Sequence, residues 1–299
     1  MTKISEKERI MKLASEHGLT LDVHSIEFDE SGADFQVAFG NDLKGGPWVL
    51  RIPRRENVVE VALYEKKIVN FLNQKVRFQV PCWEICTPTL IAYPMLEGKP
   101  AATIDPNEKA YVWYIDENDP PSCFFDSLAE VMVELHGIDH QQAHEEGIKV
   151  SAPREIRESL AKQMNEVKKD FAINEKLWER WQNWLSDDSF WPQHSAFVHG
   201  DLHPGHILVN EDHVVTGLLD WTEAKVSDPA TDFVLFCAVF GKERLESFVK
   251  KYEAAGGKTW PRMVEHIEER HAAYPLLIAQ FALITGEKEY IEMAKQALA

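Results

Sequence analysis

The stretch "FVHGDLHPGHILVN" (residues 197–210) holds three histidines and one aspartate between His199 and His206. Pro204 and Gly205 separate the second histidine from the third, and a proline inside a helix costs about 3 kcal/mol. The segment is therefore predicted to be a loop. A helical zinc motif needs two histidines four residues apart on one continuous helix, so this pattern excludes it. A metal site carried by the loop itself remains an alternative.

A short hairpin is expected directly after the loop. Residues 207–209 are apolar, residues 210–212 form a turn, and "VVTGLL" returns as a second strand that ends at Asp220. A hairpin of this length is expected to bring Asp201 and Asp220 to the same end. One carboxylate could then hold a divalent cation and the other could accept a proton from a hydroxyl group. This division of labour is the one that phosphoryl transfer requires.

The first third of the chain is predicted to form strands around one helix. "SIEFDE", "ADFQVAF" and "PWVLRIPRR" have the alternation or apolar content of strands, and "LIAYPML" is a further apolar strand. Between them, "NVVEVALYEKKIVNFLNQ" has apolar residues at helical spacing. We expect a small α+β lobe over residues 1–95.

Helices dominate the rest of the chain. "FFDSLAEVMVELHGI", "PREIRESLAKQMNEVKKDF" and "EKLWERWQNWLSDD" are predicted helices, and the hairpin stands as an island of strand among them. Residues 96–299 are therefore expected to form a second, mainly helical lobe. The chain contains no internal repeat, low-complexity tract or Gly/Ser linker.

Composition narrows the function classes. The net charge of -17 disfavours nucleic acid and anionic lipid as partners and is compatible with a cationic substrate, although an acidic surface also aids solubility. The four cysteines have no zinc-ligand spacing and are expected to be small buried hydrophobes. With no apolar run of membrane length and no secretory signal, we expect a cytoplasmic protein.

The motif "VHGDLHPGH" followed by "LLDW" resembles the catalytic loop and metal-binding aspartate of the aminoglycoside-phosphotransferase-like kinases, relatives of the protein kinases. The resemblance covers most of the chain. It implies an α+β, bilobal protein-kinase-like fold with a strand-rich N-terminal lobe and a larger helical C-terminal lobe. It also implies that Asp201 is the catalytic base and that Asp220 binds the metal, Mg²⁺.

The resemblance carries a nucleotide site onto the first lobe. Arg51 in "VLRIP" stands where protein kinases have a lysine, and arginine can still bind phosphate bidentately. Glu65 is the expected ion-pair partner, with Glu60 as the rival. The turn over the phosphates is expected at 29–34, with Ser31 and Gly32 as nucleotide contacts, although a single glycine is a weak signal.

"YPMLEG" (residues 93–98) matches the hinge between the lobes. The resemblance implies that the Pro94 carbonyl accepts from the nucleotide base and that the Leu96 amide donates to it. Tyr93 then occupies the gatekeeper position, where its bulk could favour guanine over adenine; it could equally be a core residue. Asp232 in "SDPATDF" is expected to anchor the catalytic loop, and His136 is expected to be structural.

His206 restricts the resemblance to a subfamily of these kinases. Most kinases of this type have a metal-binding asparagine at the position of His206. The strings "VHGDLHPGHILVN", "WVLRIPRR", "YPMLEG", "YEAAGG" and "WPRM" closely resemble the macrolide 2'-phosphotransferases, which keep histidine there. The resemblance implies transfer of the γ-phosphate, usually of GTP with ATP as the alternative, to the 2'-hydroxyl of the desosamine sugar. It implies an antibiotic-resistance kinase. For the oligomeric state, which the sequence leaves open, we expect a monomer.

A macrolide is a large apolar ring with a cationic sugar, so it needs an apolar surface with acidic groups nearby. The second lobe is rich in aromatic residues, and Trp178, Trp181 and Trp184 recur at helical spacing. They could line a pocket or pack that helix onto its neighbours. Candidate substrate contacts are Phe233, Tyr274 and Leu277, of which the last two could equally be core residues.

Two other functions remain open from the sequence. The chain could phosphorylate another small alcohol, such as an aminoglycoside or an amino alcohol. It could also be a nucleotide-binding pseudokinase, because Arg51 and His206 both depart from the general kinase pattern. The retention of both Asp201 and Asp220 argues against the second alternative.

Overall fold

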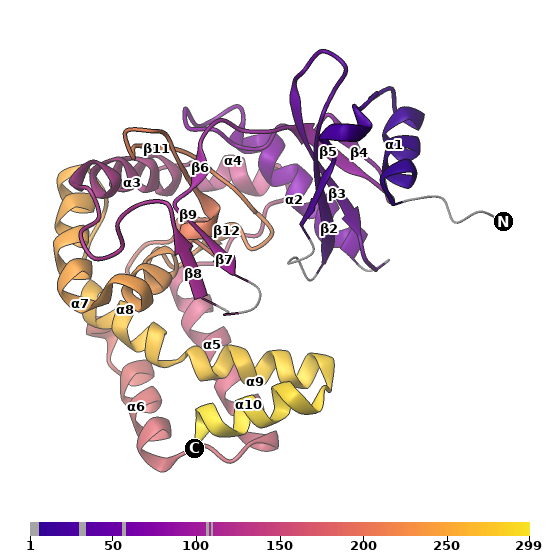
Figure 1. Ribbon diagram of the computed structural model, residues 1–299. Coiled ribbons are helices and arrows are strands. Elements are labelled where there is room, and N and C mark those ends of the chain that lie inside the picture. The colour runs from indigo at the N-terminus through magenta and orange to yellow at the C-terminus, as the bar shows by residue number, and fades with distance from the viewer. Residues whose placement is uncertain (1–5, 30–33, 56–57, 106–107, 109) are drawn as a thin grey trace. The chain divides into compact units, whose positions relative to one another are not determined.

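The computed structural model describes residues 6–29, 34–55, 58–105, 108 and 110–299 (Figure 1). The chain divides into two compact units. The first comprises Met1–Asp116 and Pro204–Thr222, and the second comprises Glu117–His203 and Glu223–Ala299. The sequence-based boundary at residue 95 falls inside the first unit. The hairpin at 207–218 also belongs to the first unit, although it lies far along the chain.

A five-stranded antiparallel sheet organises the first unit, with the strand order β1-β2-β3-β5-β4. Its strands are β1 Glu27–Asp29, β2 Phe35–Asn41, β3 Pro47–Pro53, β4 Ile85–Cys86 and β5 Ile91–Pro94. The strands predicted from the alternating segments are all present. In the register of β2 and β3, Val37 faces Arg51, which fixes the position of Arg51 in the interior of the sheet.

Two helices accompany this sheet. The N-terminal helix α1, Glu6–Glu16, packs Ile10 and Ala14 into a core shared with the sheet. Helix α2, Val58–Leu72, has a buried apolar face, as its 3.6-residue spacing predicts. Glu65 lies on that buried face and is only 1% exposed, so it must have a partner that compensates its charge.

The predicted hairpin is present in the first unit. It consists of β10 Ile207–Val209 and β11 Val215–Leu218, and β10 also pairs with the two-residue strand β6, Lys99–Pro100. A short 3₁₀ turn, Pro204–His206, leads into β10. A further pair, β7 Ala102–Asp105 with β8 Ala110–Trp113, was not predicted from the sequence.

The second unit is mainly helical, as predicted. Its only strand pair among the residues that the structure describes is β9 Ala196–Val198 with β12 Lys225–Ser227. Its helices are α3 Ser122–His136, α4 His140–Glu145, α5 Pro153–Asp170, α6 Glu175–Ser186, α7 Thr231–Ala254, α8 Met263–Ala272, α9 Tyr274–Thr285 and α10 Lys288–Leu298. Helix α7 is kinked at Gly241, and α9 and α10 run side by side (Figure 1).

The tryptophans of α6 belong to the core. Trp181 and Trp184 are at most 1% exposed, and Trp184 stacks on Trp191. Trp178 is partly buried and meets Trp181 edge to face. The structure therefore decides between the two interpretations of this stripe: it packs the helix onto its neighbours. Among the described residues, no helix combines the length and the apolar character that a membrane crossing would require.

Candidate functional site

The loop that follows β9 is held by a buried carboxylate. Asp232, near the start of α7, accepts hydrogen bonds from the backbone amides of His199 at 2.9 Å and Gly200 at 2.8 Å. Gly200 has a φ of 91°, and a Cβ atom there would lie 2.6 Å from the carbonyl oxygen of Glu223. Only glycine fits this close approach and this left-handed backbone. Together these contacts fix the direction in which the chain enters Asp201.

A chain of side chains supports Asp232 in turn. His136 Nε2 lies 3.0 Å from the Asp232 carboxylate, and its Nδ1 lies 2.8 Å from the Tyr252 hydroxyl. Burial alone would raise the pKa of Asp232, but the hydrogen bond and charge of His136 hold it below its usual range. Asp232 therefore remains an anionic acceptor for the loop amides, which is the anchoring geometry expected of it.

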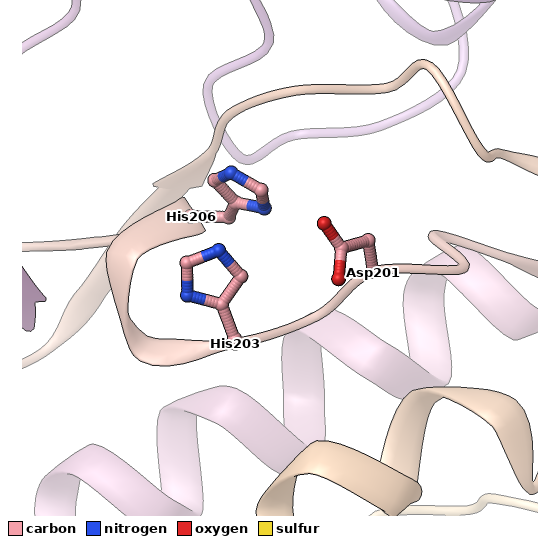
Figure 2. A group of neighbouring side chains, drawn as sticks. All are labelled: Asp201, His203 and His206. Atoms are coloured by element: carbon pink, nitrogen blue, oxygen red, sulfur yellow. The ribbon is translucent and has the colours of Figure 1, made fainter. Parts of the chain in front are cut away.

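Asp201, His203 and His206 present their side chains to one another within this loop (Figure 2). One potential ligand atom from each residue lies within 4.8 Å of the other two, and all three residues are partly buried. The backbone amide of His203 donates to the carbonyl of Asp201 at 3.1 Å, which closes the turn between them. One carboxylate and two imidazoles are therefore close together although the segment is not an α-helix. Of the two kinds of metal site considered from the sequence, this geometry matches the one carried by the loop.

Asp220 follows β11 with a φ of 58°. This left-handed conformation is rare outside glycine, although aspartate and asparagine adopt it more readily than most residues. His206 Nε2 lies 3.9 Å from Asp220 Oδ2. Burial would raise the pKa of Asp220, but the charges of His206 and Arg51 and the hydrogen bond from Thr222 lower it to about 2. The carboxylate is therefore ionised at neutral pH.

Asp201 belongs to the second unit and Asp220 to the first. The expected approach of these two aspartates therefore stays a prediction.

Arg51 and Glu65 form a buried ion pair inside the first unit, with Arg51 Nη1 2.8 Å from Glu65 Oε1. The structure thus pairs Arg51 with Glu65 rather than with Glu60, whose position on α2 is exposed. The guanidinium carbon of Arg51 also lies 4.1 Å from the centre of the Phe35 ring and 5.6 Å from that of Trp83. Burial opposes the charge of Arg51, but Glu65 raises its pKa above the ordinary value.

Glu65 also reaches the segment that follows Asp220. The backbone amide of Trp221 donates to Glu65 Oε1 at 3.3 Å. Trp221 itself is fully buried, so this backbone segment is fixed beside α2. Glu65 therefore connects the arginine on β3 to the residues next to Asp220, within a single unit.

The expected hinge residues lie at the end of β5. Tyr93 is 6% exposed, and burial raises its pKa to about 12 although Arg51 opposes the shift. Pro94 ends the strand, and the next residue, Met95, donates its amide to the Pro47 carbonyl at 2.8 Å. Leu96 follows in the segment that leads to β6. The expected phosphate contacts Ser31 and Gly32 lie outside the residues that the structure describes.

Gln79 is a functional residue of this region that was not predicted from the sequence. Its side-chain oxygen accepts from the Glu97 amide at 2.9 Å, and its side-chain nitrogen donates to the Glu97 carbonyl at 3.0 Å. Its backbone amide bonds the carbonyl of Thr216 on β11 at 2.8 Å. Gln79 thus fastens the end of the "YPMLEG" segment to the hairpin. A single glutamine between Phe78 and Val80 gives no sequence signal for such a role.

A buried cluster around Asp228 was also not predicted from the sequence. Asp228 accepts from His266 Nε2 at 2.7 Å and from Arg270 Nη1 at 2.9 Å, and the Trp184 indole donates to His266 Nδ1 at 3.1 Å. Burial would raise the pKa of Asp228, but His266 and Arg270 hold it well below its usual range. The cluster joins the start of α7 to α8 and α6. Asp228 lies about 40 residues before His266 and Arg270 in the chain, so no local sequence motif predicts that they interact.

The candidate substrate residues occupy different environments in the second unit. Phe233 is fully buried and packs edge to face on Tyr252. Tyr274 and Leu277 are 48% and 57% exposed on α9. Phe281 and Ile284 continue the same helical face and are also exposed. The exposed positions therefore form an apolar stripe along α9, which we call the α9 stripe.

The residues around Asp220 suit a divalent cation. The ionised carboxylate supplies a hard oxygen ligand, and the His206 imidazole beside it is a ligand for softer divalent ions. Asp220 and His206 belong to the same unit, and this pair alone offers both an oxygen and a nitrogen donor. Such a set can hold a cation that neutralises phosphate charge.

Taken together, the strand-rich unit with a buried arginine–glutamate pair and the Asp-containing loop define a kinase-like phosphotransferase. Comparison with known proteins supports this class. Residues 25–266 match the phosphotransferase enzyme family, so the chain belongs to that family and is a phosphotransferase enzyme.

The similar proteins include structures with the same fold. The macrolide 2'-phosphotransferase MphH from Brachybacterium faecium is 37% identical with a TM-score of 0.92, covering 98% of this chain and 97% of that one. A macrolide 2'-phosphotransferase type I is also 37% identical, with a TM-score of 0.90 and coverage of 100% and 99%. "Uncharacterized protein YcbJ" of Bacillus subtilis (strain 168) is 48% identical over 100% of this chain and 98% of its own length. The kinase-like α+β fold expected from the sequence is confirmed.

Proposed function

We propose that the protein transfers the γ-phosphate of GTP to the 2'-hydroxyl of the desosamine sugar of macrolide antibiotics, and so confers resistance to them. The observation that carries the proposal is the likeness over nearly the whole chain to two macrolide 2'-phosphotransferases at 37% identity. The histidine at position 206, where related kinases have asparagine, supports the same subfamily.

In this proposal Asp201 accepts the proton of the 2'-hydroxyl as that oxygen forms a bond to the γ-phosphorus. The bond from the γ-phosphorus to the β–γ bridging oxygen breaks, and GDP is the leaving group. A divalent cation, Mg²⁺, would be held by Asp220 and His206, and when bound it neutralises charge on the phosphate oxygens. Arg51 binds phosphate oxygens through its guanidinium, and Glu65 fixes the direction of that group. Anchoring of the loop by Asp232 then holds Asp201 in position without requiring substrate.

The expected base-binding residues are Tyr93, Pro94 and Leu96, with Ser31 and Gly32 over the phosphates. Tyr93 is buried at the end of β5, and its bulk supports guanine as the preferred base, with ATP as the weaker alternative. Among proteins of similar fold at 18% and 17% identity, one structure is a GDP complex and another is an ATP complex. These establish the fold alone, so the choice of base rests on Tyr93.

The α9 stripe supports an apolar acceptor. Its four side chains expose apolar surface on one helix, which is the kind of surface a macrolide ring would cover. The net charge of -17 favours the cationic amino group of desosamine. We propose Tyr274 and Leu277 as substrate contacts. Phe233, the third candidate, is a fully buried core residue.

We further propose that the protein works as a cytoplasmic monomer. The four cysteines are free thiols, which is usual for a reducing compartment. Measuring the mass of the protein by light scattering would check the oligomeric state.

A substrate panel tests the proposed function. Purified protein is incubated with Mg²⁺, with GTP or ATP, and with macrolides of three ring sizes, an aminoglycoside or an amino alcohol. A phosphate adduct on a macrolide, detected by mass and placed at the 2'-position by NMR, is the expected result. An adduct on the aminoglycoside or amino alcohol alone would show that the protein phosphorylates another small alcohol instead of a macrolide. Nucleotide binding without any adduct would indicate a pseudokinase.

A further inference from the structure

The side chain of Thr222 lies between two carboxylates of the first unit. Its Oγ1 is 2.7 Å from Asp220 Oδ1 and 3.3 Å from Glu65 Oε2. Its backbone amide lies 3.3 Å from the same Asp220 oxygen. Thr222 therefore touches both the expected metal ligand and the glutamate that pairs with Arg51.

A threonine hydroxyl has one proton and can donate to only one acceptor at a time. The 2.7 Å contact has the length of a strong hydrogen bond to an ionised carboxylate, whereas 3.3 Å is long for an O–H···O bond. The proton is therefore directed mainly at Asp220 Oδ1, and Glu65 Oε2 is the weaker second acceptor of the same hydroxyl. The other oxygen of Glu65 already receives Arg51 and the Trp221 amide.

These contacts make the two oxygens of Asp220 unequal. Oδ1 is engaged by the hydroxyl and the amide of Thr222, while Oδ2 is the oxygen that lies 3.9 Å from His206 Nε2. A carboxylate whose one oxygen is fixed can rotate less freely about its side-chain bonds. The remaining oxygen is therefore kept on the side of the imidazole.

We infer that Thr222 is a positioning residue for this phosphotransferase: its hydroxyl orients the Asp220 carboxylate and ties it to the Arg51–Glu65 ion pair. The inference rests on the proposed function, because it takes Asp220 as the ligand of the nucleotide-bound cation. It extends that function by linking the arginine that binds phosphate to the aspartate that binds metal, through one side chain.

A simple local turn is the alternative, because an aspartate often accepts from the amide two residues later. Such a turn requires only the backbone N–H of Thr222. It does not require the hydroxyl, and it gives no reason for contact with Glu65, which is 157 residues away in the chain. The two explanations therefore differ in what removal of the hydroxyl alone should do.

Thr222→Val separates them, because valine keeps the backbone amide, the branched shape and one methyl group but has no hydroxyl. Thr222→Ser restores the hydroxyl. Thr103→Val, at an exposed position of β7 in the same unit, controls for the substitution itself. The readout is binding of Mn²⁺ in the presence of a non-hydrolysable GTP analogue, followed by the loss of the free-ion electron spin resonance signal.

We expect Thr222→Val to weaken cation binding about tenfold, as loss of a partner that orients a metal ligand does. Thr222→Ser and Thr103→Val should bind close to wild type. In a cycle with Glu65→Gln, the Thr222→Val effect should shrink, because the glutamate end of the link is already altered. Melting curves of each variant show whether the fold is retained.

Three results would overturn the inference. Thr222→Val could bind the cation like wild type, or Thr222→Ser could bind as weakly as Thr222→Val, which would make the hydroxyl irrelevant. The effects of Thr222→Val and Glu65→Gln could also be strictly additive, which would remove the link between the two carboxylates. Macrolide is absent from this experiment, so failure to phosphorylate macrolides would count against the proposed function alone.

Discussion

The guanidinium carbon of Arg51 lies 4.1 Å from the centre of the Phe35 ring, across the β2–β3 pair. A flat guanidinium can stack on a ring and form a directed ion pair at the same time, whereas an ammonium group is a compact point charge. The position is therefore built for arginine, although related kinases have lysine there.

Arg51→Lys should raise the dissociation constant for nucleotide roughly tenfold, because both the ring contact and the fork geometry are lost. Titration calorimetry with GTP measures this constant directly. Lys67→Arg, on α2 outside this ion pair, is the matched control and should leave it unchanged. Wild-type affinity in Arg51→Lys would show that positive charge alone suffices.

Asp201→Asn should lower the rate of phosphoryl transfer by a factor of about 10² to 10⁴, the usual contribution of a positioned base. The loop is anchored through the amides of His199 and Gly200, and neither of these hydrogen bonds involves the Asp201 carboxylate. Single-turnover assays and thermal melting, measured together, check the prediction. A rate near wild type would assign the base to another residue.

Gly200→Ala should destabilise the catalytic loop. The new methyl group would lie 2.6 Å from the Glu223 carbonyl, in a backbone conformation that L residues rarely adopt. We expect a lower melting temperature together with a loss of activity. Gly45→Ala is the matched control, because it also has a positive φ but open space around the added atom. Equal melting shifts in both variants would show that the close approach itself costs little.

Asp228→Asn should destabilise the protein by about 3–5 kcal/mol at neutral pH, because it leaves Arg270 without a buried counter-charge. The native pKa of Asp228 is depressed, so its advantage over asparagine is complete above the unfolded pKa of about 4. That advantage shrinks as the pH falls toward the native pKa. Denaturant unfolding of both proteins at pH 7 and pH 3 measures it. A difference that did not narrow in acid would contradict the charge-based explanation.

Leu277→Ser and Ile284→Ser should raise KM for a macrolide severalfold without changing KM for GTP. Both side chains are largely exposed on α9, at 57% and 82%, so folding should be unaffected. Steady-state kinetics with each substrate varied in turn separates the two constants. Met293→Ser, exposed on α10, provides a control for loss of exposed apolar surface elsewhere. An unchanged macrolide KM would remove the α9 stripe from the binding site.

The sequence by itself determined the fold class and the loop. Pro204 excludes a continuous α-helix from His199 to His206, because proline inside a helix lacks the amide that donates to the preceding turn. The alternation in 33–39 and the helical spacing in 57–74 were equally local signals. The ends of β2 (Phe35–Asn41) and α2 (Val58–Leu72) lie within two residues of those bounds. The resemblance of the "HGD" segment then pointed to Asp201 and Asp220, since catalytic chemistry restricts residue type at fixed spacing.

Tertiary structure alone decided which distant groups meet. Several interactions join segments that no sequence periodicity connects. They are the ion pair of Arg51 with Glu65, the hydrogen bonds of Gln79 with Glu97, and the Asp228–His266–Arg270 cluster. It also decided that Trp181 and Trp184 are core while Leu277 is exposed, because an apolar residue has the same local pattern in either place. The Thr222 hydroxyl acquires its two carboxylates only when β11 ends beside α2, since hydrogen bonds depend on distances that only the folded chain sets.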